Sequence, residues 1–107
     1  MGQHLREFEE VVLLTVAVLY GNAYGIAILD EIENRLDRRV SIGSLQTVLK
    51  RLEQKGFLVS EFGEPTPIRG GKRKRYFTVT KYGHKVLHDM REQRLNLWND
   101  LPHIAFE

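Results

Sequence analysis

The N-terminal third of the chain contains two stretches in which apolar positions recur at helical spacing. Residues 5–20 carry Phe8, Val12 and other apolar side chains so densely that the second half is apolar on nearly every side. This pattern predicts a central helix that is buried or shared with a partner chain. Gly21 follows as a helix terminus, and residues 24–36 predict a second helix with one apolar face.

A third helix is predicted after Ser41, whose hydroxyl can accept a hydrogen bond from a free amide of the first turn. It ends at Gly56, where a left-handed residue is expected. The buried stripe, at i, i+3, i+4 and i+7, consists of Leu45, Val48, Leu49 and Leu52. The opposite face has no acidic residue and can form hydrogen bonds at every position; it consists of Ser44, Gln46, Thr47, Lys50 and Arg51.

The pattern then changes from helical to strand-like. Residues 57–62 and 76–80 are rich in β-branched and aromatic side chains, which predicts two strands. The connection, residues 63–75, contains two prolines, three glycines and five basic residues and predicts a long cationic hairpin loop. A last helix is predicted from a cap at Thr80 to about Asp100. It carries a heptad-like seam with one polar break, formed by Leu87, Met90, Arg94, Leu97 and Leu101.

Three helices, a two-stranded hairpin and a final helix give the element order of a winged helix-turn-helix. The predicted fold class is therefore mainly α with a small β-hairpin. A helix that enters the major groove of DNA must present hydrogen-bonding side chains to the base edges, as the third helix does. The basic hairpin would lie along the phosphate backbone or enter the minor groove, where the potential is strongly negative.

Composition and charge distribution further restrict the classes of function that fit the sequence. The 107 residues, 42% hydrophobic and 28% charged, suit one folded domain. The net charge is only +2, but residues 1–37 hold seven acidic and two basic residues, whereas residues 50–85 hold ten basic and three acidic residues. Such a concentrated basic segment is typical of a protein that binds a polyanion.

Several sequence motifs resemble those of the PadR family of bacterial transcriptional regulators, in particular its short subfamily with one C-terminal helix. The similarity extends from about Leu5 to Leu101. Its carriers are Tyr24-Gly25, residues 40–45, residues 49–58, the Gly-Gly-Lys-Arg-Lys-Arg-Tyr-Phe segment 70–77, and residues 78–83. The family usually has a Tyr-Pro pair where Gln46-Thr47 stand here, so the operator preference is expected to differ.

The resemblance implies a homodimeric repressor without catalytic activity or cofactor that binds a pseudo-palindromic operator in double-stranded DNA. Residues 1–80 would form the DNA-binding domain, and residues 81–107 the dimerisation helix and tail of the same compact unit. An isologous dimer places its two recognition helices about 34 Å apart. The expected dimer contacts are Phe8, Val12, Leu87, Met90, Leu97, Trp98 and Leu101. The expected DNA contacts are Ser44, Gln46, Thr47, Lys50, Arg51, Lys55, Arg69, Lys72, Arg73 and Lys74.

A small aromatic effector that stacks on Trp98, the only tryptophan, is also implied by the resemblance. Two alternatives stay open: a winged helix that binds an acidic protein, and a metal-responsive regulator that uses His84 and His88. The chain has no cysteine, which excludes thiolate chemistry and fits a reducing cytoplasm, where we expect the protein to act. No apolar run approaches the roughly 20 residues that cross a bilayer, and neither an enzyme motif nor a metal motif is present.

Overall fold

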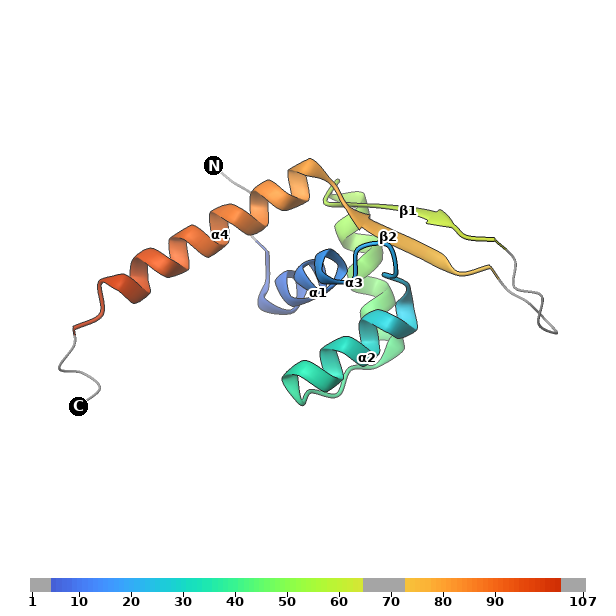
Figure 1. Cartoon of the computed structure of the whole chain (residues 1–107), viewed down its shortest axis with the longest axis horizontal. Coiled ribbons are helices and arrows are strands. Elements are labelled where there is room, and N and C mark those ends of the chain that lie inside the picture. Colours follow the sequence, from blue (N-terminus) through green and yellow to red (C-terminus); the bar gives the residue numbers. More distant parts are fainter. Residues whose placement is uncertain (1–4, 65–72, 103–107) are drawn as a thin grey trace.

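The computed structural model describes residues 5–64 and 73–102 and contains the predicted elements in the predicted order (Figure 1). The sequence-based assignment of helices and strands is thereby confirmed, with boundaries shifted by a few residues. The elements are α1 (Glu7–Val18), α2 (Gly25–Leu36), α3 (Ile42–Gln54), β1 (Leu58–Phe62), β2 (Arg75–Val79) and α4 (Lys81–Asn99).

The core forms around α1, which packs against α2, α3, β2 and the first half of α4. This central position explains the almost continuous apolar sequence of α1, because a helix contacted on several sides needs apolar side chains on several sides. The predicted stripe of α3 is fully buried in this core. Phe57, Leu58, Phe77 and Val79 close the core from the hairpin side.

Local capping positions the two helices on which the function depends. The Ser41 hydroxyl accepts a hydrogen bond from the Ser44 amide at 3.1 Å, and the Thr80 hydroxyl accepts one from the Gly83 amide at 3.0 Å. Both predicted caps are therefore confirmed. The chain reverses after α3 at Gly56, whose φ of 86° lies in the left-handed region that favours glycine.

The hairpin is anchored at its base to the connection between α1 and α2. Strands β1 and β2 pair antiparallel, with Leu58 opposite Val79 and Phe62 opposite Arg75. The Phe77 amide donates to the Ala23 carbonyl at 2.8 Å, and Tyr24 forms a bridge with Tyr76. The hairpin points away from the helical body on the side opposite to the free end of α4 (Figure 1).

Helix α4 divides into a packed half and an overhanging half (Figure 1). Leu87 and Met90, two of the expected dimer contacts, are each only 8% exposed because they pack on the chain's own core. Little of either side chain is left for a partner chain to cover. Val12 is likewise fully buried within the chain and is not available to a partner. From Arg91 to the end of the helix every residue is exposed.

Candidate nucleic-acid interface

The outward face of α3 presents polar side chains to solvent, as predicted. Ser44, Gln46, Thr47 and Lys50 are all exposed. The two hydroxyls are held by local bonds, since Ser44 accepts from the Ser41 hydroxyl at 2.9 Å and Thr47 donates to the Gly43 carbonyl at 3.0 Å. A hydroxyl that donates within the helix still has lone pairs that can accept from a base amino group.

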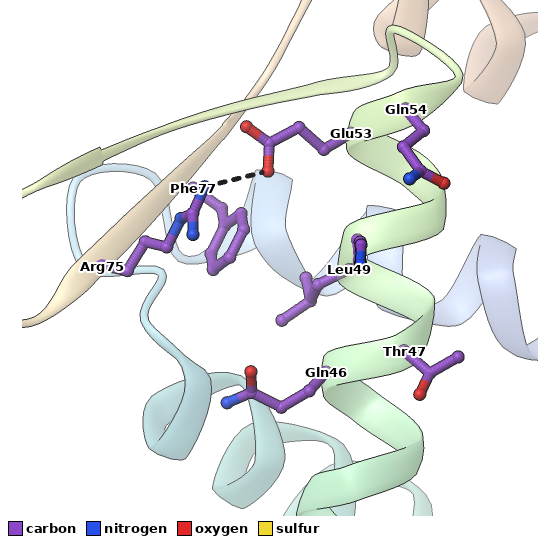
Figure 2. Close-up of a pocket in the computed structure, with 8 residues that line it drawn as sticks. Gln46, Thr47, Leu49, Glu53, Gln54, Arg75 and Phe77 are labelled. Atoms are coloured by element: carbon purple, nitrogen blue, oxygen red, sulfur yellow. Dashed lines mark ion pairs between the residues drawn. The ribbon is translucent and has the colours of Figure 1, made fainter.

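A groove of about 590 Å³ is lined by residues of α3 and by Arg75 and Phe77 of β2. Figure 2 shows Gln46 directed from α3 toward the hairpin side, where Arg75 and Phe77 lie, whereas Thr47 points to the other side of the helix. Lys50 also lines this groove. A helix and a cationic hairpin that flank one open groove form a concave surface with polar side chains on both walls.

Glu53, the one carboxylate among the described residues that line this groove, is neutralised within the chain. It lies 3.5 Å from the Arg75 guanidinium and accepts a hydrogen bond from the Ser60 hydroxyl at 2.8 Å (Figure 2). Arg75 in turn donates to the Ser60 hydroxyl at 2.8 Å. This network joins α3 to both strands of the hairpin. The sequence reasoning missed it, because an acidic residue on a basic surface carries no local signal for its partner.

The hairpin carries its cations against aromatic rings and backbone carbonyls. Lys74 Nζ lies 4.2 Å from the centroid of the Tyr24 ring, and Arg73 donates to the Gly63 carbonyl at 2.9 Å. Both side chains remain exposed, so they can contact a phosphate. The predicted contacts Arg69 and Lys72 lie outside the described residues.

Two of the predicted DNA contacts have partners inside the chain. Lys55 Nζ lies 3.4 Å and an Arg51 guanidinium nitrogen 3.8 Å from the carboxylate of Glu9, which is buried in the first turn of α1. Burial alone would raise the pKa of Glu9, but the Arg6 amide, Lys55 and Arg51 together hold the pKa below its ordinary value of 4.5. The sequence assigned both cations to DNA because helical periodicity gives no information about a carboxylate about 40 residues away.

A second groove, about 510 Å³, lies between α1 and α4. Trp98 lines it and is 65% exposed in the single chain. His84 and His88 lie on the same groove, and in residues 5–64 and 73–102 no third potential ligand joins them in a metal-binding cluster. The apolar part of the lining consists of Leu14, Ala17, Leu87, Leu95 and Trp98.

A helical core that exposes the polar face of a third helix beside a cationic hairpin defines a winged helix-turn-helix protein, here with an added C-terminal helix. Residues 13–89 match the Transcriptional regulator PadR-like family, and the chain belongs to this family. Its members are transcriptional regulators and not enzymes, in agreement with the sequence-based prediction. No curated protein matches the sequence significantly.

Solved structures support the same assignment. A PadR-like transcription factor from Bacteroides fragilis matches with a TM-score of 0.75 and 24% identity, over 91% of this chain and 88% of that one. A PadR family transcriptional regulator from Eggerthella lenta matches with a TM-score of 0.68 and 26% identity, over 87% and 80% of the two chains. Bacillus subtilis PadR in complex with operator DNA matches with a TM-score of 0.66 and 20% identity, over 79% and 47%. Within the described parts of this chain, no helix has the length and apolar character of a membrane span.

Proposed function

We propose that this protein is a homodimeric, cytoplasmic bacterial repressor that binds a pseudo-palindromic operator through α3 and the hairpin. The observation that carries the proposal is the exposed polar face of α3 beside a groove in which Glu53 is already paired with Arg75. A free carboxylate on this surface would repel phosphates, and the pairing removes that obstacle. The Bacillus subtilis relative with the same fold was solved with operator DNA.

Sequence specificity is assigned to Ser44, Gln46 and Thr47, and affinity to the exposed cations. The amide of Gln46 can form a bidentate pair with adenine, worth about 1–3 kcal/mol of discrimination when well placed. Lys50, Arg73 and Lys74 are exposed and would neutralise phosphates. Arg51 and Lys55 are left out of the primary contacts, because a phosphate would have to replace Glu9 as their partner.

The dimer is proposed to form through the overhanging half of α4 and the exposed side of α1. Leu97 is 72% exposed and Trp98 65% exposed, and both lie on a helix segment that nothing in the described chain covers. Leu14 and Val18 form a second exposed apolar area on α1. Exposed apolar side chains that gather in this way are typical of an interface. Phe8, partly buried against the core, stays a proposed contact at the rim.

The groove between α1 and α4 is the proposed site of a small aromatic effector. Trp98 offers a flat apolar surface, and the described rim carries His84, His88, Arg91 and Arg94 with Glu10 as its one carboxylate. Since Arg94 already pairs with Glu10, the remaining rim groups favour an aromatic ligand that bears a carboxylate. Quenching of Trp98 fluorescence by phenolic acids and by flat aromatic cations, compared side by side, tests this ligand class. If neither class of compound quenches the fluorescence, the proposed effector site is contradicted.

Selection of binding sites from a random double-stranded DNA library tests the DNA-binding function. The selected site should be two-fold symmetric and should outcompete random duplex. Lys50→Ala should weaken binding to all sequences alike and reduce the slope of log K against log salt by about 0.9 for each phosphate that is no longer neutralised. Lys85→Ala is the matched control, because it removes the same charge from α4, where Lys85 pairs with Asp89 on an exposed surface. Gln46→Ala should instead relax the preference at one base step.

The outcomes separate the proposed regulator from a winged helix that binds an acidic protein. An acidic-partner module would bind polyanions with the same salt dependence but would enrich no sequence in the selection. Equal salt slopes for Lys50→Ala and the parent protein would remove Lys50 from the interface. Enrichment of a site that a monomer binds as tightly as the dimer would contradict the two-fold arrangement.

A further inference from the structure

The first turn of α1 contains two adjacent glutamates that are both buried. Glu9 is 2% and Glu10 6% exposed, and they are the only buried charged residues in the described parts of the chain. Removing a carboxylate from water is unfavourable unless it is paired and hydrogen-bonded. Each of the two is paired, and their partners lie on different helices.

Glu9 connects α1 to α3. One oxygen of its carboxylate accepts a hydrogen bond from the Arg6 amide at 2.9 Å, and the other lies 3.4 Å from Lys55 Nζ and 3.8 Å from Arg51. Arg51 lies in the last turn of α3, and Lys55 is the residue at its C-terminal cap. The end of the DNA-reading helix is thus tied to the start of α1.

Glu10 connects the same turn of α1 to α4. Its carboxylate forms an ion pair with Arg94, the residue that interrupts the apolar seam of α4. The buried part of α4 ends at Met90, so this pair lies beyond the last packed residue and holds the start of the overhanging half. Arg94 also lines the α1–α4 groove and a smaller hollow of about 140 Å³ beside Leu97, Trp98 and Leu101.

We propose that Glu9 and Glu10 couple the position of α4 to that of α3, so that they are positioning residues for the DNA-reading helix. Glu9 and Glu10 are adjacent residues in one turn of α1. If Arg94 moves and α1 moves with it through Glu10, the carboxylate of Glu9, which pairs with Lys55 and Arg51, must move as well. A partner chain or small molecule that displaces the overhanging half of α4 acts directly on the Glu10–Arg94 pair. The biological meaning of this coupling rests on the proposed DNA-binding function, whereas the structural connection between α4 and α3 does not.

The coupling is tested with Arg94→Gln and Glu10→Gln, and the control is Asp89→Asn. Asp89 belongs to an exposed ion pair with Lys85 on the same helix, and its substitution makes the same acid-to-amide change as Glu10→Gln. Amide chemical shifts are recorded by NMR for the full chain. Both test variants should move the resonances of residues 51–55, at the C-terminal end of α3 and its cap, and the control should leave them in place.

The second readout is affinity for the DNA site selected with the parent protein. Arg94→Gln and Glu10→Gln should change this affinity about 2- to 30-fold, the range measured for energetic coupling between separated sites. Arg94→Lys, which keeps the charge, should restore most of the parent value. If Glu10→Gln does not fold, the comparison of Arg94→Gln with Arg94→Lys decides, because Arg94 is largely exposed and its replacement leaves the core packing unchanged.

The two readouts fail in different ways. If α3 resonances and DNA affinity in Arg94→Gln both match the parent protein, the coupling is overturned while the DNA-binding function stands. If α3 resonances respond but the parent protein selects no DNA sequence, the DNA-binding function is overturned while the mechanical connection stands. Shifts confined to α4 and the first turn of α1 would overturn the coupling as well, because the glutamates would then have a local structural role only.

Discussion

Gly83 is the position at which a single methyl group should be most harmful. It is the third residue of α4 and lies against the turn between α3 and β1. A Cβ placed there would overlap the Phe57 carbonyl oxygen and lie 2.8 Å from the Val79 side chain. The same carbonyl accepts a hydrogen bond from the Thr80 amide at 3.0 Å, so it cannot move away without loss of that bond.

The expected size of the effect follows from two opposing contributions. Forcing one extra carbon into a packed site costs about 1–3 kcal/mol. Replacing glycine by alanine inside a helix returns up to about 1 kcal/mol through helix propensity. Because the overlap involves backbone atoms, the overpacking cost should lie in the upper part of its range. Gly83→Ala should therefore lower the free energy of unfolding by about 1–2 kcal/mol.

Gly43→Ala is a matched control: it makes the same chemical change, but the expected change in the free energy of unfolding has the opposite sign. Gly43 lies in the first turn of α3, and a Cβ there would meet nothing within 4 Å. This variant should gain about 0.5–1 kcal/mol from helix propensity. Urea unfolding followed by circular dichroism measures both, at one protein concentration because dimerisation contributes to apparent stability. A Gly83→Ala protein as stable as Gly43→Ala would refute the packing argument.

Three further predictions concern capping, pH and assembly. Ser41→Ala removes the hydroxyl that accepts from Ser44 and should cost about 1 kcal/mol in urea unfolding; no loss would deny the cap an energetic role. Folding lowers the pKa of Glu9, so the unfolded chain binds a proton there more tightly than the folded chain does. The stability that the pairing of Glu9 provides is therefore lost as the pH falls from 4.5 through the lowered pKa of the folded state. Glu9→Gln should flatten that acid-side decline, and an unchanged pH profile would contradict it. Leu97→Asp should give a monomer in sedimentation with unchanged helix content, whereas a parent-like mass would exclude this part of α4 from the interface.

The sequence predicts those features that depend on neighbouring residues. The i, i+3, i+4, i+7 stripe of α3 and the hydroxyls before α3 and α4 are determined within one or two helical turns. Their burial and hydrogen bonds agree with the prediction. Gly83 stands out in the sequence only as part of a motif, because the need for glycine arises from Phe57 and Val79, which are brought together by the fold.

Tertiary contacts explain what the sequence-based interpretation of surfaces did not foresee. Leu87 and Met90 are predicted to need a partner chain, since an apolar seam on a helix does not indicate what covers it. The DNA contacts expected of Arg51 and Lys55 stay predictions, but their ion pairs with Glu9 were not foreseen, since a cation on a helix does not indicate whether a carboxylate lies nearby. The sequence does contain one signal of these ion pairs. Glu9 and Glu10 adjoin a nearly continuous apolar segment, where a buried carboxylate requires a cationic partner.

The internal ion pairs change how the basic segment should be counted. Of its ten basic residues, Arg51 and Lys55 pair with Glu9, Arg75 with Glu53 and Lys85 with Asp89. A cation that already neutralises a carboxylate releases fewer counterions from DNA, because contact with a phosphate leaves its first partner uncompensated. The salt dependence of operator binding should therefore be shallower than a count of basic residues gives at about 0.9 per neutralised phosphate. The pairs of Glu9 with Arg51 and Lys55 and of Glu53 with Arg75 also join α3 to α1 and to β2. We therefore expect them to orient the DNA-reading surface while they reduce the charge available to phosphates.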